Sequence, residues 1–176
     1  LLAPRRGQMV VDYCAGAGGK TLAIGALMRS TGRLYAWDVH AKRLAGLAPR
    51  LARSGLSNVH PVAIRGATDA RVKRLSGKID RVLVDAPCSG SGTLRRNPDL
   101  KWRFDDTELA RMVSLQSEVL RAAARLVKPG GRLVYSTCSL LALENQDVVE
   151  GFLAERSEFV VVPAAEVLRG QGIEID

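Results

Sequence analysis

The chain has 176 residues, of which 47% are hydrophobic and 25% charged, and a formal net charge of +8. Because no apolar run approaches the ~20 residues of a membrane-spanning helix and the first residues lack the features of a secretory signal, we expect a single cytoplasmic domain without a membrane partner. Three cysteines without a Cys-x-x-Cys pair, together with two histidines, argue against a zinc site and a disulfide framework, so no metal is expected.

Short apolar runs alternate with longer amphipathic segments along the chain. Pro49 predicts a kink or break in its helix, and Pro61 places its strand near a sheet edge. The alternation predicts an α/β fold, a three-layer sandwich with a mostly parallel sheet and right-handed crossovers. The expected strands are residues 9–15, 32–39, 58–64, 79–87, 132–139 and 158–164. The expected helices are residues 19–30, 41–55, 105–131 and 142–156, and a long loop covers residues 88–105.

Ligands of such sheets bind beyond the carboxyl ends of the strands. This edge would gather the chemically informative positions of the sequence. They are residues 12–19, Asp38, Asp69, residues 85–92 and residues 137–139.

The segment "DYCAGAGGKT" (12–21) places small residues where a strand turns into a helix. Such a turn lets a ligand approach the free N–H groups of the helix start, although it can also be a tight packing turn. The spacing does not fit a phosphate-binding P-loop, because position 14 is not glycine. Asp38 is placed to accept hydrogen bonds from ribose hydroxyls, or to cap the helix that begins near Ala41. Together these features indicate an adenosine-containing cofactor and leave open a dinucleotide or S-adenosylmethionine.

Two of the cysteines follow predicted strand ends. Cys88 lies in "DAPCSGSGT" and Cys138 in "VYSTCSLL", after strands that we expect to be neighbours. A single buried cysteine is usually an inert small hydrophobic residue, and this interpretation suits Cys14. Two cysteines at the ligand edge of one sheet are harder to explain in this way.

The segments "DYCAGAGGKT", "DAPCSGSGTLRRNPDLKW", "LQSEVL" and "VYSTCSLLALENQ" together resemble the RNA 5-methylcytosine methyltransferases of the NOL1/NOP2/Sun family, most closely its bacterial ribosomal RNA members. The match runs in order through nearly the whole chain. It departs from the commoner family form at Gly16 and Ala17, where Ala-Pro is usual. The resemblance implies a Rossmann-like class I S-adenosylmethionine-dependent methyltransferase fold.

The resemblance also implies the site. Cys138 would be the nucleophile and Cys88 the thiol that helps the product leave; Asp85 and Lys20 are expected to be catalytic from the chemistry described below. The cofactor would be S-adenosylmethionine, which leaves as S-adenosylhomocysteine. Its implied contacts are Cys14, Ala15, Gly16, Ala17, Gly18, Gly19, Lys20, Asp38, Asp69 and Asp85, of which Asp69 lies in a loose match.

The expected chemistry explains these residue types. Cytosine C5 is a poor nucleophile until a thiolate adds at C6, which would be the task of Cys138. A protonated Asp85, with a pKa raised by burial or by neighbouring acids, would meet the charge that develops toward N3. Lys20 or nearby arginines would supply the positive field that favours a thiolate.

The loop segment "LRRNPDLKWR" (94–103) mixes cations with an aromatic residue. Arg95, Arg96, Lys101, Trp102 and Arg103 suit RNA phosphates and base stacking, although a solvated basic loop has the same composition. The positive net charge also favours an acidic partner, above all nucleic acid, and the resemblance implies that this partner is ribosomal RNA.

Three alternatives remain at this stage. The domain can be an inactive S-adenosylmethionine-fold module that binds RNA, it can modify tRNA instead of ribosomal RNA, or it can be a DNA cytosine methyltransferase in which Cys88 attacks. The Thr-Cys-Ser motif disfavours the third. The resemblance further implies that residues 1–176 form one catalytic domain without the N-terminal RNA-binding region and the last strand of the family, so that residues 158–176 lack a pairing partner. No obligate protein partner is expected.

Overall fold

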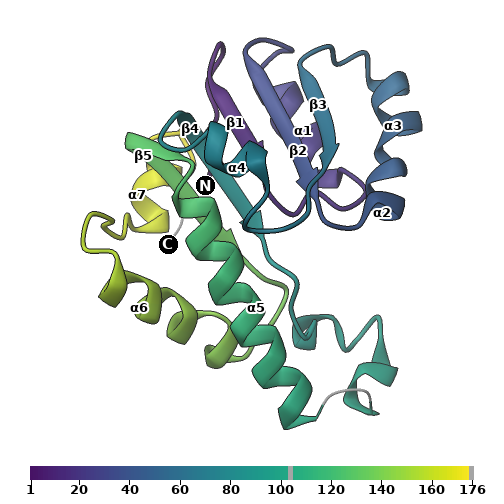
Figure 1. The fold of residues 1–176 in the computed structure, drawn as a ribbon, viewed down its shortest axis with the longest axis vertical. Coiled ribbons are helices and arrows are strands. Elements are labelled where there is room, and N and C mark those ends of the chain that lie inside the picture. Colours follow the sequence, from purple (N-terminus) through teal and green to yellow (C-terminus); the bar gives the residue numbers. More distant parts are fainter. Residues whose placement is uncertain (103–104, 175–176) are drawn as a thin grey trace.

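A parallel sheet forms the centre of the molecule. The computed structural model describes residues 1–102 and 105–174, and within them five strands pair in the order β3-β2-β1-β4-β5. Every pair is parallel, which confirms the expected α/β sheet (Figure 1). The strand order reverses between β1 and β4, the position at which such sheets bind ligands. The strands are β1 (Met9–Asp12), β2 (Arg33–Asp38), β3 (Val59–Ala63), β4 (Ile79–Asp85) and β5 (Val127–Ser136).

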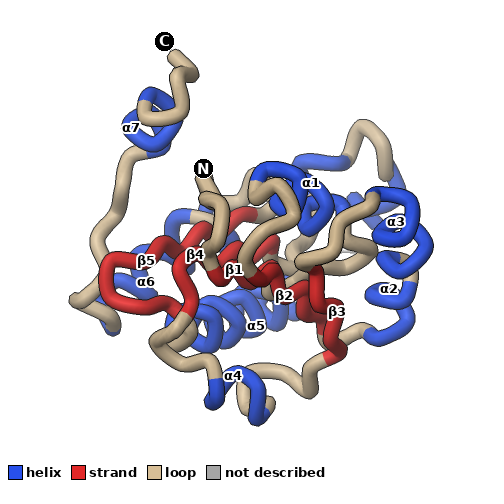
Figure 2. The backbone as a smooth tube through the Cα atoms, turned by 90° about the horizontal axis from the view of Figure 1, so that it is seen from above, coloured by secondary structure: helices blue, strands red, loops and turns tan. Residues whose placement is uncertain are grey.

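Helices cover both faces of the sheet. Figure 2 shows α1 on one face and α4 and α5 on the other, which confirms the three layers. The described α-helices are α1 (Gly19–Leu27), α2 (Ala41–Ala45), α3 (Leu47–Ser54), α4 (Ala70–Arg74), α5 (Asp106–Ala124), α6 (Gln146–Glu155) and α7 (Ala164–Arg169). Short 3-10 turns are η1 (Ser91–Thr93), η2 (Pro98–Trp102) and η3 (Ala142–Glu144). None of the described helices is long and apolar enough to cross a membrane.

The core follows the alternation of strand side chains. Val10 and Leu83 belong to the apolar cluster shared with α1, whereas Val11, Val82 and Val84 belong to the cluster on the α5 face. Because both faces are buried, these strands are continuous apolar runs. The sheet is thereby a rigid base for the loops at its carboxyl edge.

Two proline predictions are confirmed. The expected helix 41–55 is broken at Gly46 into α2 and α3. Pro49 lies in the first turn of α3, where its missing N–H costs no helical hydrogen bond. Pro61 lies in β3, which is an edge strand.

Two other expectations are wrong. The predicted helix 105–131 ends at Ala124, and residues 127–131 belong to β5, because Gly130 adopts a positive φ of 70° that a helix does not accommodate. The predicted strand 158–164 is absent: residues 158–163 have no regular structure and α7 begins at Ala164. An apolar run forms a strand only when a neighbour pairs with its backbone, and in the described part of the chain β5 pairs with β4 alone. Val160 is consequently 82% exposed.

Candidate active site

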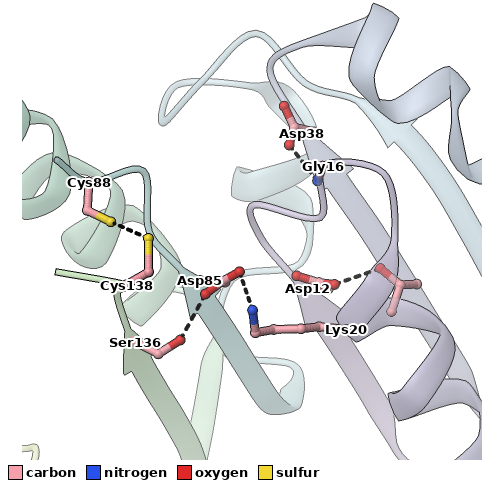
Figure 3. A network of polar contacts seen from close by, with 9 residues as sticks. Asp12, Gly16, Lys20, Asp38, Asp85, Cys88, Ser136 and Cys138 are labelled. Atoms are coloured by element: carbon pink, nitrogen blue, oxygen red, sulfur yellow. Dashed lines mark hydrogen bonds and ion pairs between the residues drawn. The ribbon is translucent and has the colours of Figure 1, made fainter. Parts of the chain in front are cut away.

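The loop between β1 and α1 is fixed by Asp38 at the end of β2. The backbone N–H of Gly16 donates to Asp38 Oδ2 at 2.7 Å (Figure 3). The backbone N–H of His40 donates to Asp38 Oδ1 at 2.7 Å. Gly18 is left-handed, and a Cβ there would lie 2.2 Å from Leu47 Cδ1. The small residues therefore let this loop pack closely against β2 and α3.

The same loop presents backbone toward the edge of the sheet. Ala15 is buried and donates its N–H to Trp37 O at 2.8 Å, while Ala17 and Gly19 are exposed. Cys14 packs against the core, and burial raises the pKa of its thiol to about 12. Cys14 is thus a protonated, structural cysteine, and exposed backbone is what this loop offers a ligand.

Asp12 is a buried carboxylate that sequence reasoning placed at this edge but did not include among the site residues. Its Oδ2 accepts from Thr21 Oγ1 at 2.6 Å, whereas Oδ1 is buried and has no hydrogen-bond partner within the described residues. Burial raises its pKa to about 6. A buried acceptor next to the loop that carries the exposed residues Ala17 and Gly19 fits a ligand with a cationic or hydrogen-bond-donating group, such as the ammonium group of S-adenosylmethionine.

Asp85, at the end of β4, links α1 to β5. Its Oδ2 lies 2.5 Å from Lys20 Nζ, and its Oδ1 accepts from Ser136 Oγ at 3.2 Å. Figure 3 shows this carboxylate between Lys20 and the two cysteines. Lys20 is thus paired with Asp85 in this structure, and a positive field from Lys20 or nearby arginines at the thiols stays a prediction.

The two edge cysteines meet. Cys88 Sγ and Cys138 Sγ lie 3.2 Å apart, as expected from neighbouring strands (Figure 3). Cys138 is exposed and Cys88 is half-buried. Burial, and next the hydrogen bond to Cys138, raise the pKa of Cys88 above its ordinary value. Cys88 therefore keeps its proton at neutral pH, and Cys138 is the accessible sulfur.

Asp69 has a local structural task. It is buried, caps α4 by accepting from Arg71 N at 2.9 Å, and accepts from Arg65 N at 3.0 Å. The hydrogen bonds from Arg71 and Arg65 hold its pKa below the ordinary value. Contact with an adenine stays a prediction for this residue.

The basic loop lies beyond the carboxyl edge of the sheet, beside the start of α5 (Figure 1). Arg95 and Arg96 are exposed, and Trp102 on η2 is 81% exposed. Arg103 and the side chain of Lys101 lie outside what the structure describes. Contact of this loop with RNA stays a prediction.

Sequence reasoning assigned no role to three buried or half-buried polar residues near the cysteines. Glu144 and Gln116 are fully buried, and Asn145 follows Glu144. Glu144 and Asn145 occur in the segment "ALENQ", and Gln116 in "LQSEVL", both of which carried the resemblance. Their contacts across the fold were the missing information.

The strand order, the glycine loop after β1 and the acidic residue ending β2 define a Rossmann-like class I S-adenosylmethionine-dependent methyltransferase fold. Solved methyltransferases with less than 25% identity match it, which shows the fold alone. A family model described as 16S rRNA methyltransferase RsmB/F matches residues 1–175. The chain therefore belongs to the RsmB/F family of methyltransferases.

Individual relatives agree. A probable ribosomal RNA small subunit methyltransferase B from Synechocystis is 43% identical over 90% of this chain and 35% of its own length. The structure of a protein designated PH0851 matches with a TM-score of 0.88 and 41% identity, over 92% of this chain and 36% of that one. NSun6 from Pyrococcus horikoshii, solved with the S-adenosylmethionine analogue SFG, matches with a TM-score of 0.78 and 29% identity, over 93% and 42%. The chain spans about a third of the length of the curated relatives it matches.

Proposed function

We propose that this chain is the catalytic part of an enzyme that methylates C5 of cytosine in small-subunit ribosomal RNA. The observation that carries the proposal is the pair of thiols 3.2 Å apart at the same carboxyl edge of the sheet as the glycine loop (Figure 3). The family and the names of the relatives support a ribosomal RNA substrate. The cytoplasmic location expected from the sequence stays a prediction.

The residues of the glycine loop fit S-adenosylmethionine. Gly16 to Gly19 would approach it through backbone, Asp38 keeps lone pairs for the ribose hydroxyls, and the unpartnered Oδ1 of Asp12 would accept from the ammonium group. When bound, the cofactor supplies the electrophilic methyl group that C5 takes.

Cys138 would act first on the base. Its thiol loses the proton to solvent, and the sulfur bonds to C6, which moves electron density to C5 and negative charge toward N3. Lys20 and Asp85 form an ion pair at the carboxyl edge of the sheet. A proton of this pair would form the hydrogen bond to N3. Such stabilisation requires Lys20 and Asp85 to remain beside the base while the sulfur adds to C6 and while C5 takes the methyl group.

Cys88 would act on Cys138 and on product release. Because Cys88 keeps its proton, its S–H can donate to the Cys138 sulfur at 3.2 Å, which stabilises the thiolate before attack and as it leaves C6. A water oriented by Cys88 would take the C5 proton while the S–C6 bond breaks. The presence of both thiols, Asp85 and Lys20 favours an enzyme over an inactive binding module.

The test is methyl transfer to RNA. The chain is incubated with S-adenosylmethionine carrying a tritiated methyl group and with unmodified small-subunit ribosomal RNA or with tRNA, and the nucleosides are separated. The proposal predicts labelled 5-methylcytidine from ribosomal RNA. Label in tRNA alone would transfer the assignment to tRNA, and bound cofactor without label in either RNA would favour a binding-only domain.

A further inference from the structure

Glu144 is a buried carboxylate that the reaction does not use. Its side chain is fully buried at the end of η3. Burial raises its pKa, but hydrogen bonds from Ser139, Ser89 and Gln116 outweigh burial, so the pKa lies below the ordinary value. A buried charge persists only where hydrogen bonds compensate it, and its donors show what it holds.

The donors to Glu144 fix the chain on both sides of Cys88. Ser89 donates its backbone N–H to Glu144 Oε1 at 2.7 Å and its hydroxyl to Oε2. Gln116, from α5, donates through Nε2 both to Glu144 Oε1 and to Pro87 O, each at 2.9 Å. Pro87 and Ser89 are therefore both held, and Cys88 lies between them.

The next residue, Asn145, fixes the chain on both sides of Cys138. Its Oδ1 accepts from Thr137 Oγ1 at 2.7 Å, and its Nδ2 donates to Ser139 O at 3.0 Å and to Leu141 O at 2.8 Å. Thr137 and Ser139 are the neighbours of Cys138. Two consecutive residues thus hold the two cysteine loops, Glu144 holding one and Asn145 the other.

We propose that Glu144 and Asn145 are positioning residues that set the distance between the Cys88 and Cys138 sulfurs. They act through the two loops and do not touch the base. The thiol geometry stands by itself, while its consequence for catalysis rests on the proposed function. A shift of about 1 Å in such groups costs about 10²-fold in rate.

The test measures the thiol pair without using activity. The protein is equilibrated with glutathione buffers, in which Cys88 and Cys138 lose two electrons and two protons to one glutathione disulfide and form a disulfide, while two glutathione molecules are released. Mass spectrometry of peptides distinguishes the Cys88–Cys138 disulfide from any disulfide that involves Cys14. The equilibrium constant gives the effective concentration of one thiol at the other.

Substitutions at Asn145 and at Glu144 test how each residue holds its cysteine loop. Asn145→Asp keeps the acceptor for Thr137 but removes both donors, and because the Asn145 side chain makes no capping hydrogen bond to α6, the substitution removes no cap. Glu144→Ala removes the acceptor for Ser89 and Gln116, whereas Glu144→Gln keeps an acceptor for both. We expect the effective concentration to fall about tenfold or more for Asn145→Asp and Glu144→Ala, and to be restored within about threefold by Glu144→Gln. Glu155→Ala, on the exposed side of α6, is the matched control and should leave it unchanged.

The same variants separate positioning from a general loss of structure. We expect kcat to fall while the KM for RNA stays unchanged. If Glu144→Ala does not fold, Asn145→Asp carries the test. An unchanged effective concentration in folded Asn145→Asp would overturn the positioning proposal even if the unaltered chain methylates RNA. A reduced effective concentration, together with no methylation by the unaltered chain, would overturn the proposed function alone.

Discussion

Cys88 and Cys138 bring their Sγ atoms to 3.2 Å although they are 50 positions apart in the sequence. The parallel pairing of β4 with β5 produces this contact, because Asp85 lies opposite Ser136 in the register. Beyond the end of each strand, the chain runs only a few residues to its cysteine. The sheet, and not local sequence, thus places one protonated thiol beside one accessible thiol.

Gly92→Ala should displace Cys138. A Cβ at Gly92 would lie 2.7 Å from Cys138 O, which also accepts the Gly92 N–H at 2.9 Å. We expect methyl transfer to fall about 10²-fold because the nucleophile moves. Gly151→Ala in α6 meets no atom within 4 Å and should instead add about 1 kcal/mol of stability with unchanged activity. Equal activities of the two variants would refute this view of Gly92.

Lys20 and Asp85 should act as a unit. Their side chains are 55% and 35% exposed, so the ion pair contributes only about 0–1 kcal/mol to stability. Lys20→Met and Asp85→Asn should each lower kcat by about 10²-fold, and the double variant should be little worse than either. Rate measurements with thermal unfolding check this, and additive losses would show that the two residues act separately.

Asp12 should make stability depend on pH. Its pKa is about 6 in the folded chain against 3.8 for a free Asp. Folding therefore favours the protonated form of Asp12. Its contribution to the free energy of unfolding is fully present below pH ~4 and is lost as the pH rises to ~6. This loss amounts to about 3 kcal/mol. Asp12→Asn cannot ionise, so its stability relative to the unaltered chain should increase by this amount between pH 4 and pH 7. Urea unfolding at both pH values measures the difference, and a constant value would contradict the burial argument.

Arg95 and Arg96 should contribute electrostatic affinity for RNA. Both are exposed on the loop beyond the sheet edge. Replacing both by Ala should reduce the slope of log K against log salt concentration by about 1.4, as expected for two lost phosphate contacts. Arg53→Ala, exposed on α3, is the control and should leave the slope unchanged. An unchanged slope in the double variant would identify the loop as merely solvated.

The sheet was predictable from its apolar runs, and the cysteine contact from the position of both cysteines just after two strands that pair as neighbours. The strand expected at 158–164 was wrong because β-branched residues form a strand only when another strand pairs with them. α4 was not predicted, because its five residues Ala70–Arg74 give little helical periodicity. The hydrogen bonds of Glu144 to Ser89 were beyond reach as well, because they join residues 55 positions apart.

The most direct measurement maps a covalent adduct. The chain is incubated with S-adenosylmethionine and ribosomal RNA that contains 5-fluorocytosine, whose C5 fluorine blocks release, and the crosslinked peptide is identified by mass spectrometry. We predict a bond between Cys138 Sγ and C6 of the base, absent in Cys138→Ala and retained in Cys88→Ala. A bond to Cys88, or no bond while the cofactor is bound, would contradict it.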